Sequence, residues 1–368
     1  LVDSALGTVC SLGVTAPDVI IKEKNTEPTV EKEVKENSTG NYGKRNDANF
    51  NETVEFRSTI KIGKGASRIV YHDLMSDGLD FKNDENDVRV YLKQQGAEEE
   101  TPVGKDNYTV VVPAEEDKHC FEEGACTFDV EFDKSFCESL AENNELIIYY
   151  SATLNENATV GVEGNPNTAQ LTYGEKGEGK SEPSKTETYT WEINIFKYTG
   201  DLNAPKPLSG AKFVLLKDDN GKPGDPVAYF KGTSFKVDNS ASSEDCFTEI
   251  VTGESGAFNI QGLDAGKYYL EELEAPEGYN KLVDPVVVNI TTQNLLENQE
   301  NTVDTTQNPI CNVANADKNG IINVVNNSGL QLPSTGGIGT TIFYVGGGIL
   351  VIGAIVYLVT RRRAKSSK

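Results

Sequence analysis

The sequence predicts an all-β ectodomain of two immunoglobulin-like β-sandwiches in tandem, followed by a C-terminal transmembrane helix. Short alternating segments such as TVEFRSTI, YTVVV, ELIIYY and DPVVVNI recur between Gly, Asn, Asp and Pro turns from Pro28 to Asn327. This is the pattern of β-sandwiches, and long apolar stripes at helical spacing are absent from that stretch. The polar, Pro-containing segment 181–188 (SEPSKTET) is typical of a linker. We therefore expect one domain at 26–183 and another at 184–328.

The N-terminal segment 1–25 contains neither an initiator Met nor a charged region followed by an apolar run. A signal peptide would show both features. We expect this segment to be the remnant of a preceding domain, followed by a linker.

The C-terminal segment 329–368 predicts a membrane anchor. Residues 340–359 (TTIFYVGGGILVIGAIVYLV) are apolar over about the length that a helix needs to span a bilayer. Basic residues follow at 361–363, 365 and 368, as expected for a tail retained in the cytoplasm. The motif LPSTG stands just before the span, at Leu332, Pro333, Ser334, Thr335 and Gly336.

This combination of motif, span and basic tail resembles the cell-wall sorting signal of Gram-positive surface proteins. The resemblance implies that a sortase cuts between Thr335 and Gly336 and joins the Thr335 carboxyl group to an amine, which links the chain to peptidoglycan. The span would then be only a transient membrane anchor. We expect a secreted protein at the cell surface, attached to the wall.

The composition argues against several classes of function. The net charge of −23 disfavours nucleic acid, whose phosphates require Lys and Arg. The chain has two His and one Met, and contains no HExxH, CxxC or phosphate-binding Gly loop. No catalytic triad, carboxylate pair or metal-ligand set is recognisable either. We therefore expect no cofactor, no metal and no enzymatic activity.

The cysteines leave several pairings open. There are six, at positions 10, 120, 126, 137, 246 and 311. Disulfides are permitted in an exported protein, and sequence alone does not choose among the connectivities. Cys120 and Cys126 flank a short loop that a disulfide would close. Cys246 and Cys311 fall in one predicted domain and could pair, and free thiols are the alternative.

Three predicted strands of the second domain each end an apolar stripe with a polar residue. Residues two apart in a strand share a face, which puts Lys197 with Ile195, Glu272 with Leu270, and Asn326 with Val324. Any one of the three would more often be a strand end that reaches solvent. Together they are the reactants of one reaction, because a desolvated Lys loses its proton and becomes a nucleophile, and a buried carboxyl can carry a proton. Attack of the amine on the Asn carboxamide would release ammonia and form a Lys–Asn amide bond.

The segment YYLEELEAPEGYNKLVDPV resembles the E-box (YxLxETxAPxGY) of collagen-adhesin B-type (CnaB) domains. Leu273 replaces the usual Thr, and FKYTG, LSGAKFVL and INVVNNSG match as well, so that the resemblance covers about 186–337. It implies that Lys197 is the nucleophile, Glu272 the catalytic acid and Asn326 the electrophile of an intramolecular isopeptide bond. Asn327 is the neighbouring alternative, although strand parity favours Asn326.

The first domain has a similar set of residues. Lys32 lies between Val30 and Val34 on one strand face, Asp73 shares a face with Tyr71, and Asn167 shares one with Ala169. These segments resemble the isopeptide-forming (CnaA-like) middle domain of Gram-positive backbone pilins. The resemblance implies a bond from Lys32 to Asn167, with Asp73 as the proton shuttle and Asn165 as the fallback electrophile.

Backbone pilins polymerise when a sortase joins the LPxTG Thr of one subunit to a Lys of the next, in a VYPKN-like motif. The segment 19–25 (VIIKEKN) occupies that place here, which implies Lys24 as the pilin-motif lysine, although Lys22-Glu23 replace Tyr-Pro. A charged linker is the alternative. We expect a pilus subunit that supports adhesion, with sortase, neighbouring pilin subunits, peptidoglycan and a host surface ligand as partners. The second hypothesis is a monomeric wall-anchored adhesin that binds host matrix protein or glycan.

Overall fold

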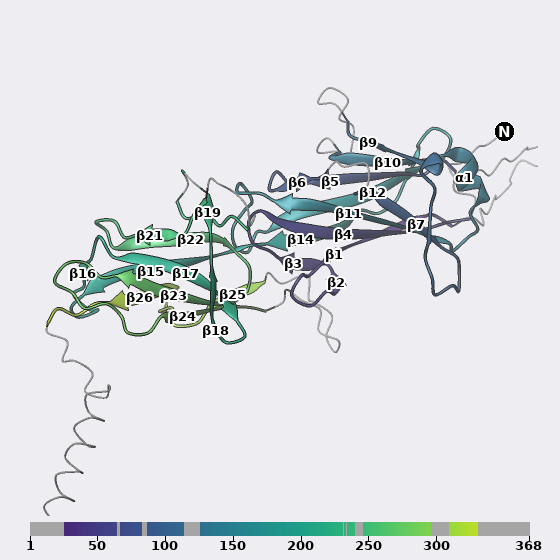
Figure 1. The fold of residues 1–368 in the computed structure, drawn as a ribbon. Helices are drawn as coiled ribbons and strands as arrows, with labels where there is room; N and C mark the ends of the chain where they lie inside the picture. Colours follow the sequence, from purple (N-terminus) through teal and green to yellow (C-terminus); the bar gives the residue numbers. More distant parts are fainter. Residues whose placement is uncertain are drawn as a thin grey trace, which may run out of the picture.

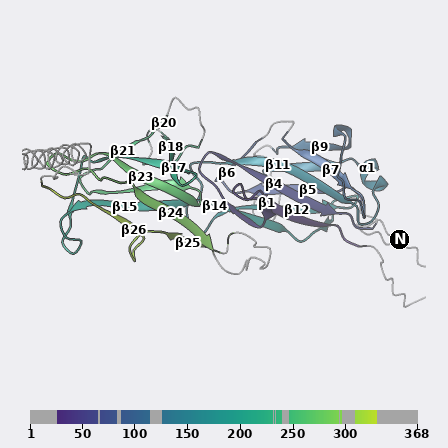
Figure 2. The ribbon, with the colours of Figure 1, turned by 60° about the horizontal axis from the view of Figure 1, so that its bottom comes forward.

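The chain forms two pairs of β-sheets arranged end to end along an elongated molecule (Figures 1 and 2). The structure is a computed structural model, which describes residues 26–64, 67–82, 87–113, 126–230, 232, 234–239, 246–293, 295 and 309–329. Within these ranges the helical elements are a 3-10 helix, η1 (Lys105–Asn107), and an α-helix, α1 (Lys134–Ser139). The predicted all-β class is confirmed.

The first pair consists of two seven-stranded sheets. The β4 sheet has the order β2-β1-β4-β11-β7-β8, with β6 also on β11; the β12 sheet has the order β3-β14-β12-β5-β10-β9, with β13 also on β12. The strands of the β4 sheet are β1 (Thr29–Lys35), β2 (Tyr42–Gly43), β4 (Glu52–Lys61), β6 (Leu79–Phe81), β7 (Arg89–Lys93), β8 (Thr101–Pro102) and β11 (Glu145–Leu154). Those of the β12 sheet are β3 (Arg45–Asp47), β5 (Val70–Met75), β9 (Tyr108–Val111), β10 (Phe128–Phe132), β12 (Asn165–Tyr173), β13 (Gly179–Lys180) and β14 (Ser184–Tyr189).

The second pair consists of a four-stranded β15 sheet and a six-stranded β23 sheet. In the β15 sheet, β15 (Trp191–Thr199) lies beside β16 (Lys206–Pro207), β22 (Ala257–Leu263) and the parallel strand β26 (Ile321–Val325). The β23 sheet contains β17 (Lys212–Asp219), β18 (Lys222–Pro226), β21 (Glu249–Val251), β23 (Gly266–Glu274), β24 (Val286–Gln293) and β25 (Ile310–Val313). A small two-stranded ladder joins β19 (Tyr229–Phe230) to β20 (Cys246–Phe247).

Each pair of sheets encloses its own apolar core, because apolar residues alternate with polar ones along the strands. In β4, for example, Val54, Phe56, Ser58 and Ile60 are fully buried, while the residues that alternate with them face outward. One core gathers side chains from Val30 to Tyr173, and the other gathers side chains from Tyr189 to Val324. Two separate cores of this kind are what two tandem sandwiches require.

The segment expected to be a linker contains a strand. Ser184–Tyr189 forms β14, which pairs antiparallel with β12 and parallel with β3. All of its residues before Tyr189 are polar, but they alternate in burial. Thr186 and Thr188 are buried, while Lys185 and Glu187 face outward as an ion pair. The sheet pairing therefore favours a domain boundary near Thr190 and not at 183/184.

The junction between the two pairs of sheets is held by buried polar contacts. The Asp47 Oδ2 atom accepts hydrogen bonds from Trp191 Nε1 at 2.6 Å and from the Ala265 backbone N–H at 3.2 Å. The Asp264 backbone N–H donates to Asn49 Oδ1 at 3.1 Å, and the carboxyl groups of Asp264 and Asp47 interact electrostatically. Residues of the first sandwich thus bind directly to the first strand and to the β22–β23 turn of the second.

The Phe50 ring packs directly against the backbone of Gly262 at the same junction. The Phe50 backbone N–H donates to the Gly262 carbonyl oxygen at 3.0 Å. Gly262 has φ +84°, and a Cβ placed there would lie 2.1 Å from the Phe50 ring. Only glycine fits this backbone conformation and this close approach together.

The cysteines differ in state. Cys126 is disulfide-bonded, whereas Cys137 and Cys311 are free. The pairing of Cys246 with Cys311 is therefore not formed, and burial raises the pKa of the Cys311 thiol to about 11.

Within the described ranges, no helix is long and apolar enough to cross a membrane. The expected span at 340–359, the LPSTG motif and Lys24 lie outside the described residues.

Candidate functional site

The second sandwich brings together the three residues that the strand pattern selected. Lys197 lies near the end of β15, and Asn326 directly follows β26, the parallel strand beside it. The Asn326 backbone N–H donates to the Tyr198 carbonyl oxygen at 3.0 Å, which fixes the register of the two strands. Glu272 reaches the same point from β23 in the facing sheet.

These three side chains form a closed, buried cluster. The Lys197 Nζ atom contacts Asn326 Oδ1 and lies 3.0 Å from Glu272 Oε1. The Asn326 Nδ2 group donates to that same Glu272 oxygen at 2.8 Å, and the Leu282 backbone N–H donates to Oε2 at 2.8 Å. Lys197 is 0% exposed, and the other two are 1% exposed. The carboxyl group thus bridges the amine and the amide.

Burial also prepares the amine electrostatically. Desolvation lowers the pKa of Lys197, against the opposing effect of Glu272. The Phe213 ring, whose centroid lies 5.3 Å from Nζ, supplies part of the apolar surroundings. A buried amine with a lowered pKa is a better nucleophile than an exposed one.

Asn327, the alternative electrophile, is not part of this cluster. It is exposed, and its carbonyl oxygen accepts a hydrogen bond from the Asn280 backbone N–H at 3.0 Å. The alternation of the strand therefore separates the two adjacent asparagines, as the parity of the sequence predicts.

The first sandwich contains a second buried cluster, around Lys32. Lys32 comes from β1 in the β4 sheet, while Asp73 on β5 and Asn167 on β12 come from the facing β12 sheet. All three residues are 0% exposed. The Lys32 Nζ atom forms an ion pair with Asp73 Oδ2, and the paired strands β5 and β12 set Asp73 opposite Ala169 and Asn167 opposite Met75.

Two tyrosines that sequence reasoning missed complete this cluster. The Tyr150 hydroxyl contacts Lys32 Nζ and donates to Asp73 Oδ2 at 2.5 Å; the Tyr71 hydroxyl donates to the same oxygen at 2.7 Å. The Asn167 Nδ2 group donates to the Tyr150 hydroxyl at 3.4 Å. Tyr150 thus connects the amine, the carboxylate and the amide.

The electrostatics of the Lys32 cluster follow from its burial. Desolvation lowers the pKa of Lys32 to about 8, although Asp73 acts in the opposite direction. Desolvation also raises the pKa values of Tyr71 and Tyr150 well above their usual value, so that both stay protonated and can donate. Within the described part of the chain, Asp73 Oδ1 and Asn167 Oδ1 are buried without a hydrogen-bond partner. Such unpaired buried oxygens are costly and require an explanation.

Asn165, the fallback electrophile, is occupied by the backbone. Its Nδ2 group donates to the carbonyl oxygens of Thr159 and Thr188, and its Oδ1 atom accepts from the Thr159 N–H at 2.8 Å. It therefore closes the turn before β12, and Asn167 is the asparagine that reaches the Lys32 cluster.

A third polar group has the residue types of a metal site. Among the described residues, His72, Cys126 and Asp129 place one ligand atom each within 4.8 Å of one another. Cys126 is disulfide-bonded, however, so its sulfur is not available as a thiolate ligand. The His72 ring instead bonds Asp129 Oδ1 and Thr172 Oγ1, each at 2.8 Å, across neighbouring strands.

Two family models match the chain. Residues 194–307 match the prealbumin-like fold domain SpaA, and residues 325–366 match the LPXTG cell wall anchor motif. The trypsin-resistant surface T6 protein of Streptococcus pyogenes serotype M6 is 26% identical in an alignment that covers 86% of this chain and 64% of that protein. The chain thus spans slightly less than two-thirds of the length of this curated relative.

Solved structures share the fold. The pilus 2b backbone protein of group B streptococcus has a TM-score of 0.52 at 22% identity, over 83% of this chain and 99% of that one. The full-length major pilin RrgB of Streptococcus pneumoniae has a TM-score of 0.55 at 16% identity, over 86% of this chain and 78% of that one. The chain is therefore a cell-wall-anchored surface protein that carries a SpaA prealbumin-like domain and an LPXTG motif on the fold of Gram-positive major pilins.

Proposed function

We propose that this chain is a structural subunit of a sortase-assembled pilus, stabilised by two autocatalytic Lys–Asn isopeptide bonds. The observation that carries the proposal is the pair of fully buried lysines, each paired with an acid in a cluster that also contains a buried asparagine, in two successive sandwiches. A lone buried ammonium costs several kcal/mol. Conversion of each amine into an amide would remove that cost.

At the first step in the second sandwich, the neutral Lys197 Nζ attacks the Asn326 Cγ carbonyl. The C–N bond to Nζ forms as the carbonyl becomes tetrahedral, and Glu272 takes a proton from the attacking nitrogen. Glu272 then passes the proton to the Asn326 Nδ2 group, which leaves as ammonia when its C–N bond breaks. The hydrogen bond from Nδ2 to Glu272 Oε1 at 2.8 Å supports this route, because the proton has one short path to the leaving group.

In the first sandwich, Lys32 attacks Asn167 with Asp73 as the proton shuttle. The Tyr150 hydroxyl would assist this proton transfer, because it contacts the amine and lies within hydrogen-bonding distance of the Asn167 amide. The Tyr150 phenol can therefore hand a proton from the amine side of the site to the departing amide nitrogen, with Asp73 as the base.

The positions of the two bonds favour a role under tension. In the second sandwich the bond would join β15 to the residue after β26, the first and last strands of the β15–β26 unit. In the first it would join β1 to β12, from the facing sheet. A pulling force would then pass through covalent bonds and not unzip ladders of backbone hydrogen bonds.

Assembly would use one residue on each side of the two sandwiches, Lys24 before the first and Thr335 after the second. A sortase would cleave after Thr335 and transfer its carboxyl group to Lys24 of a neighbouring subunit, or to peptidoglycan at the base of the pilus. Expression in a Gram-positive host with its pilus sortase tests this directly. We expect high-mass ladders on denaturing gels that disappear in Lys24→Ala and remain in Lys22→Ala. Wall-anchored monomers without ladders would contradict polymerisation and favour the monomeric adhesin.

A further inference from the structure

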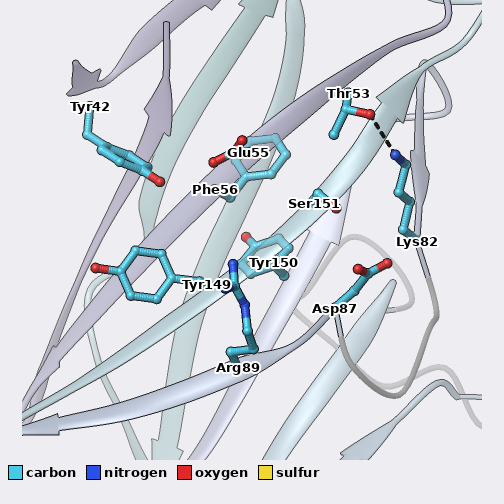
Figure 3. Close-up of a pocket in the computed structure, with 10 residues that line it drawn as sticks. All are labelled: Tyr42, Thr53, Glu55, Phe56, Lys82, Asp87, Arg89, Tyr149, Tyr150 and Ser151. Atoms are coloured by element: carbon cyan, nitrogen blue, oxygen red, sulfur yellow. Dashed lines mark hydrogen bonds between the residues drawn. The ribbon is translucent and has the colours of Figure 1, made fainter. Parts of the chain in front are cut away.

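A pocket on the outer face of the β4 sheet has the composition of a saccharide site. It has a volume of about 440 Å³ and is lined by residues of β2, β4, β7 and β11, together with Lys82 and Asp87 (Figure 3). Tyr150 of the Lys32 cluster is one of the lining residues. Strand pairing sets Tyr149 opposite Arg89 and Ser151 opposite Glu55, so these side chains are presented by rigid, paired strands. The volume lies in the usual range for small-ligand pockets.

One side of the pocket is aromatic and held in place before any ligand binds. Tyr42 and Tyr149 meet edge to face with their ring centroids 6.5 Å apart, and Figure 3 shows both rings along the same side. The Arg57 guanidinium stacks on the Tyr42 ring at 4.3 Å, and Tyr91 packs edge-on against Tyr149 at 5.6 Å. Both rings stay half-buried and keep part of their surface toward the pocket. Rings held in this way lose little conformational entropy when a ligand packs against them.

Among the described residues, the polar side of the pocket is balanced in charge. Lys82 and Arg89 bring two positive charges, and Glu55 and Asp87 bring two negative charges. Lys82 donates to Thr53 Oγ1 at 2.6 Å, and Glu55 pairs with Lys35 through Oε2 at 3.1 Å. Among the described residues, the side chains of Arg89 and Asp87 have no hydrogen-bond or ion-pair partner, and Figure 3 shows them between the tyrosines and Lys82. Donors and acceptors therefore line the same side of the pocket.

We propose that this pocket, the Tyr42–Tyr149 pocket, binds a neutral pyranose saccharide. A sugar ring has an apolar C–H face that suits a tyrosine ring, and hydroxyl groups that donate and accept at once. Carboxylate and guanidinium groups that line one pocket can accept from and donate to such hydroxyls. The balanced local charge gives no preference for an anionic sugar, and the chain's net charge of −23 opposes one at long range.

The test is a titration of the purified full chain with four probes. Lactose and N-acetyllactosamine represent host glycans, neutral fragments of bacterial wall polysaccharide represent the bacterial source, and 3′-sialyllactose is the charged counterpart. We expect saturable binding of at least one neutral probe, and weaker binding of the sialylated one. The probe that binds identifies the source. No binding of any neutral probe, or binding of the sialylated one alone, overturns the proposal.

Variants locate the binding in the pocket. Arg89→Ala and Tyr149→Ala should each weaken the affinity about tenfold or more, because each removes one central contact. Tyr149→Phe keeps the ring and should bind within about twofold of the wild type. Lys93→Ala should do the same, because Lys93 lies on β7 with Arg89 but outside the pocket. Unchanged affinity in both alanine variants, with melting temperatures like the wild type, would place the ligand elsewhere and overturn the assignment. The outcome is independent of pilus assembly, which the ladder experiment measures.

Discussion

The Lys197 amine contacts the side-chain oxygen of Asn326, although the two residues are 129 positions apart in the chain. The parallel pairing of β15 with β26 creates this contact, and Glu272 closes it from the facing sheet. Every residue between the two thus belongs to a loop that a single bond would close. Such a bond restricts the unfolded chain, as a disulfide does, and the effect grows with the length of the loop.

Loss of this bond should therefore destabilise the second sandwich strongly. For Glu272→Gln we expect a chain whose free energy of unfolding falls by about 4–5 kcal/mol, the scale for closing a loop of this length. The glutamine keeps the shape but cannot serve as the base. Thermal unfolding measures the change, and Glu271→Gln, on the outward face of the same strand, is the matched control. Equal melting temperatures for Glu272→Gln and the wild type would contradict a stabilising role of the bond.

Tyr150 should control bond formation in the first sandwich. Tyr150→Phe keeps the ring that stacks on Phe56 at 5.3 Å but removes the hydroxyl that reaches Lys32, Asp73 and Asn167. We expect the Lys32–Asn167 bond to form about a hundredfold more slowly, the lower end of the range for loss of one acid–base group. Peptide mass mapping at successive times after expression follows the reaction. Tyr149→Phe, the outward neighbour, should react like the wild type; equal rates for both variants would exclude a role of the Tyr150 hydroxyl.

The acid pair at the junction should make stability depend on pH. Burial raises the pKa of Asp47 to about 6, and that of Asp264 well above its usual value, with the Asp47 charge as a further cause. Glu36 and Glu52 also face the pair. Because the folded chain binds more protons than the unfolded chain, stability is greatest below about pH 4 with respect to this pair and falls as the pH rises through about 6.

Asp264→Asn should flatten this dependence and stabilise the junction at neutral pH. The Asn side-chain N–H can donate to Asp47 at any pH, because the amide does not titrate. The repulsion between two carboxylates therefore disappears. Melting temperatures at pH 5 and pH 7.5 measure the effect, and Asp225→Asn on exposed β18 is the control. A wild-type chain that becomes more stable from pH 5 to pH 7.5, with the same slope in the 264 variant, would contradict this account.

The close approach of Phe50 to Gly262 should tolerate no side chain. Gly262→Ala adds a methyl group that would lie 2.1 Å from the ring, besides the cost of φ +84°. Gly96→Ala carries a similar backbone cost at φ +80°, with nothing within 4 Å, and isolates that term. We expect about 1 kcal/mol of destabilisation for Gly96→Ala and at least about 2 kcal/mol more for Gly262→Ala. Limited proteolysis near Thr190 should increase only in Gly262→Ala. Equal destabilisation by the two substitutions would mean that the junction rearranges to accept the methyl group.

The Lys197 cluster could be predicted from the sequence because the alternation within each strand decides which residues face the core. A period of two residues puts Lys197, Glu272 and Asn326 at the ends of apolar stripes, and the sandwich has only one interior for them. The same parity correctly separated Asn326 from Asn327. The all-β class followed from the same alternation.

The features that were missed depend on contacts between distant segments. Tyr71 and Tyr150 look like ordinary core aromatics, and only the facing sheets bring their hydroxyls to Lys32. β14 was hidden because buried threonines read as a polar linker. The acid pair at the junction joins residues 47 and 264, which no spacing rule relates. Burial of polar groups by tertiary packing, and not local propensity, decided each of these cases.

The most direct test of the central claim is the intact mass of the purified chain under reducing conditions, with Lys32→Ala and Lys197→Ala as references. The account predicts a wild-type mass short by two ammonia molecules, and each variant short by one. A loss of one in the wild type would leave a single bond and remove the role assigned to Lys32, Asp73 and Asn167 or to their counterparts. A wild-type mass equal to that of its sequence would contradict the account, because both buried clusters would then be unreacted polar groups.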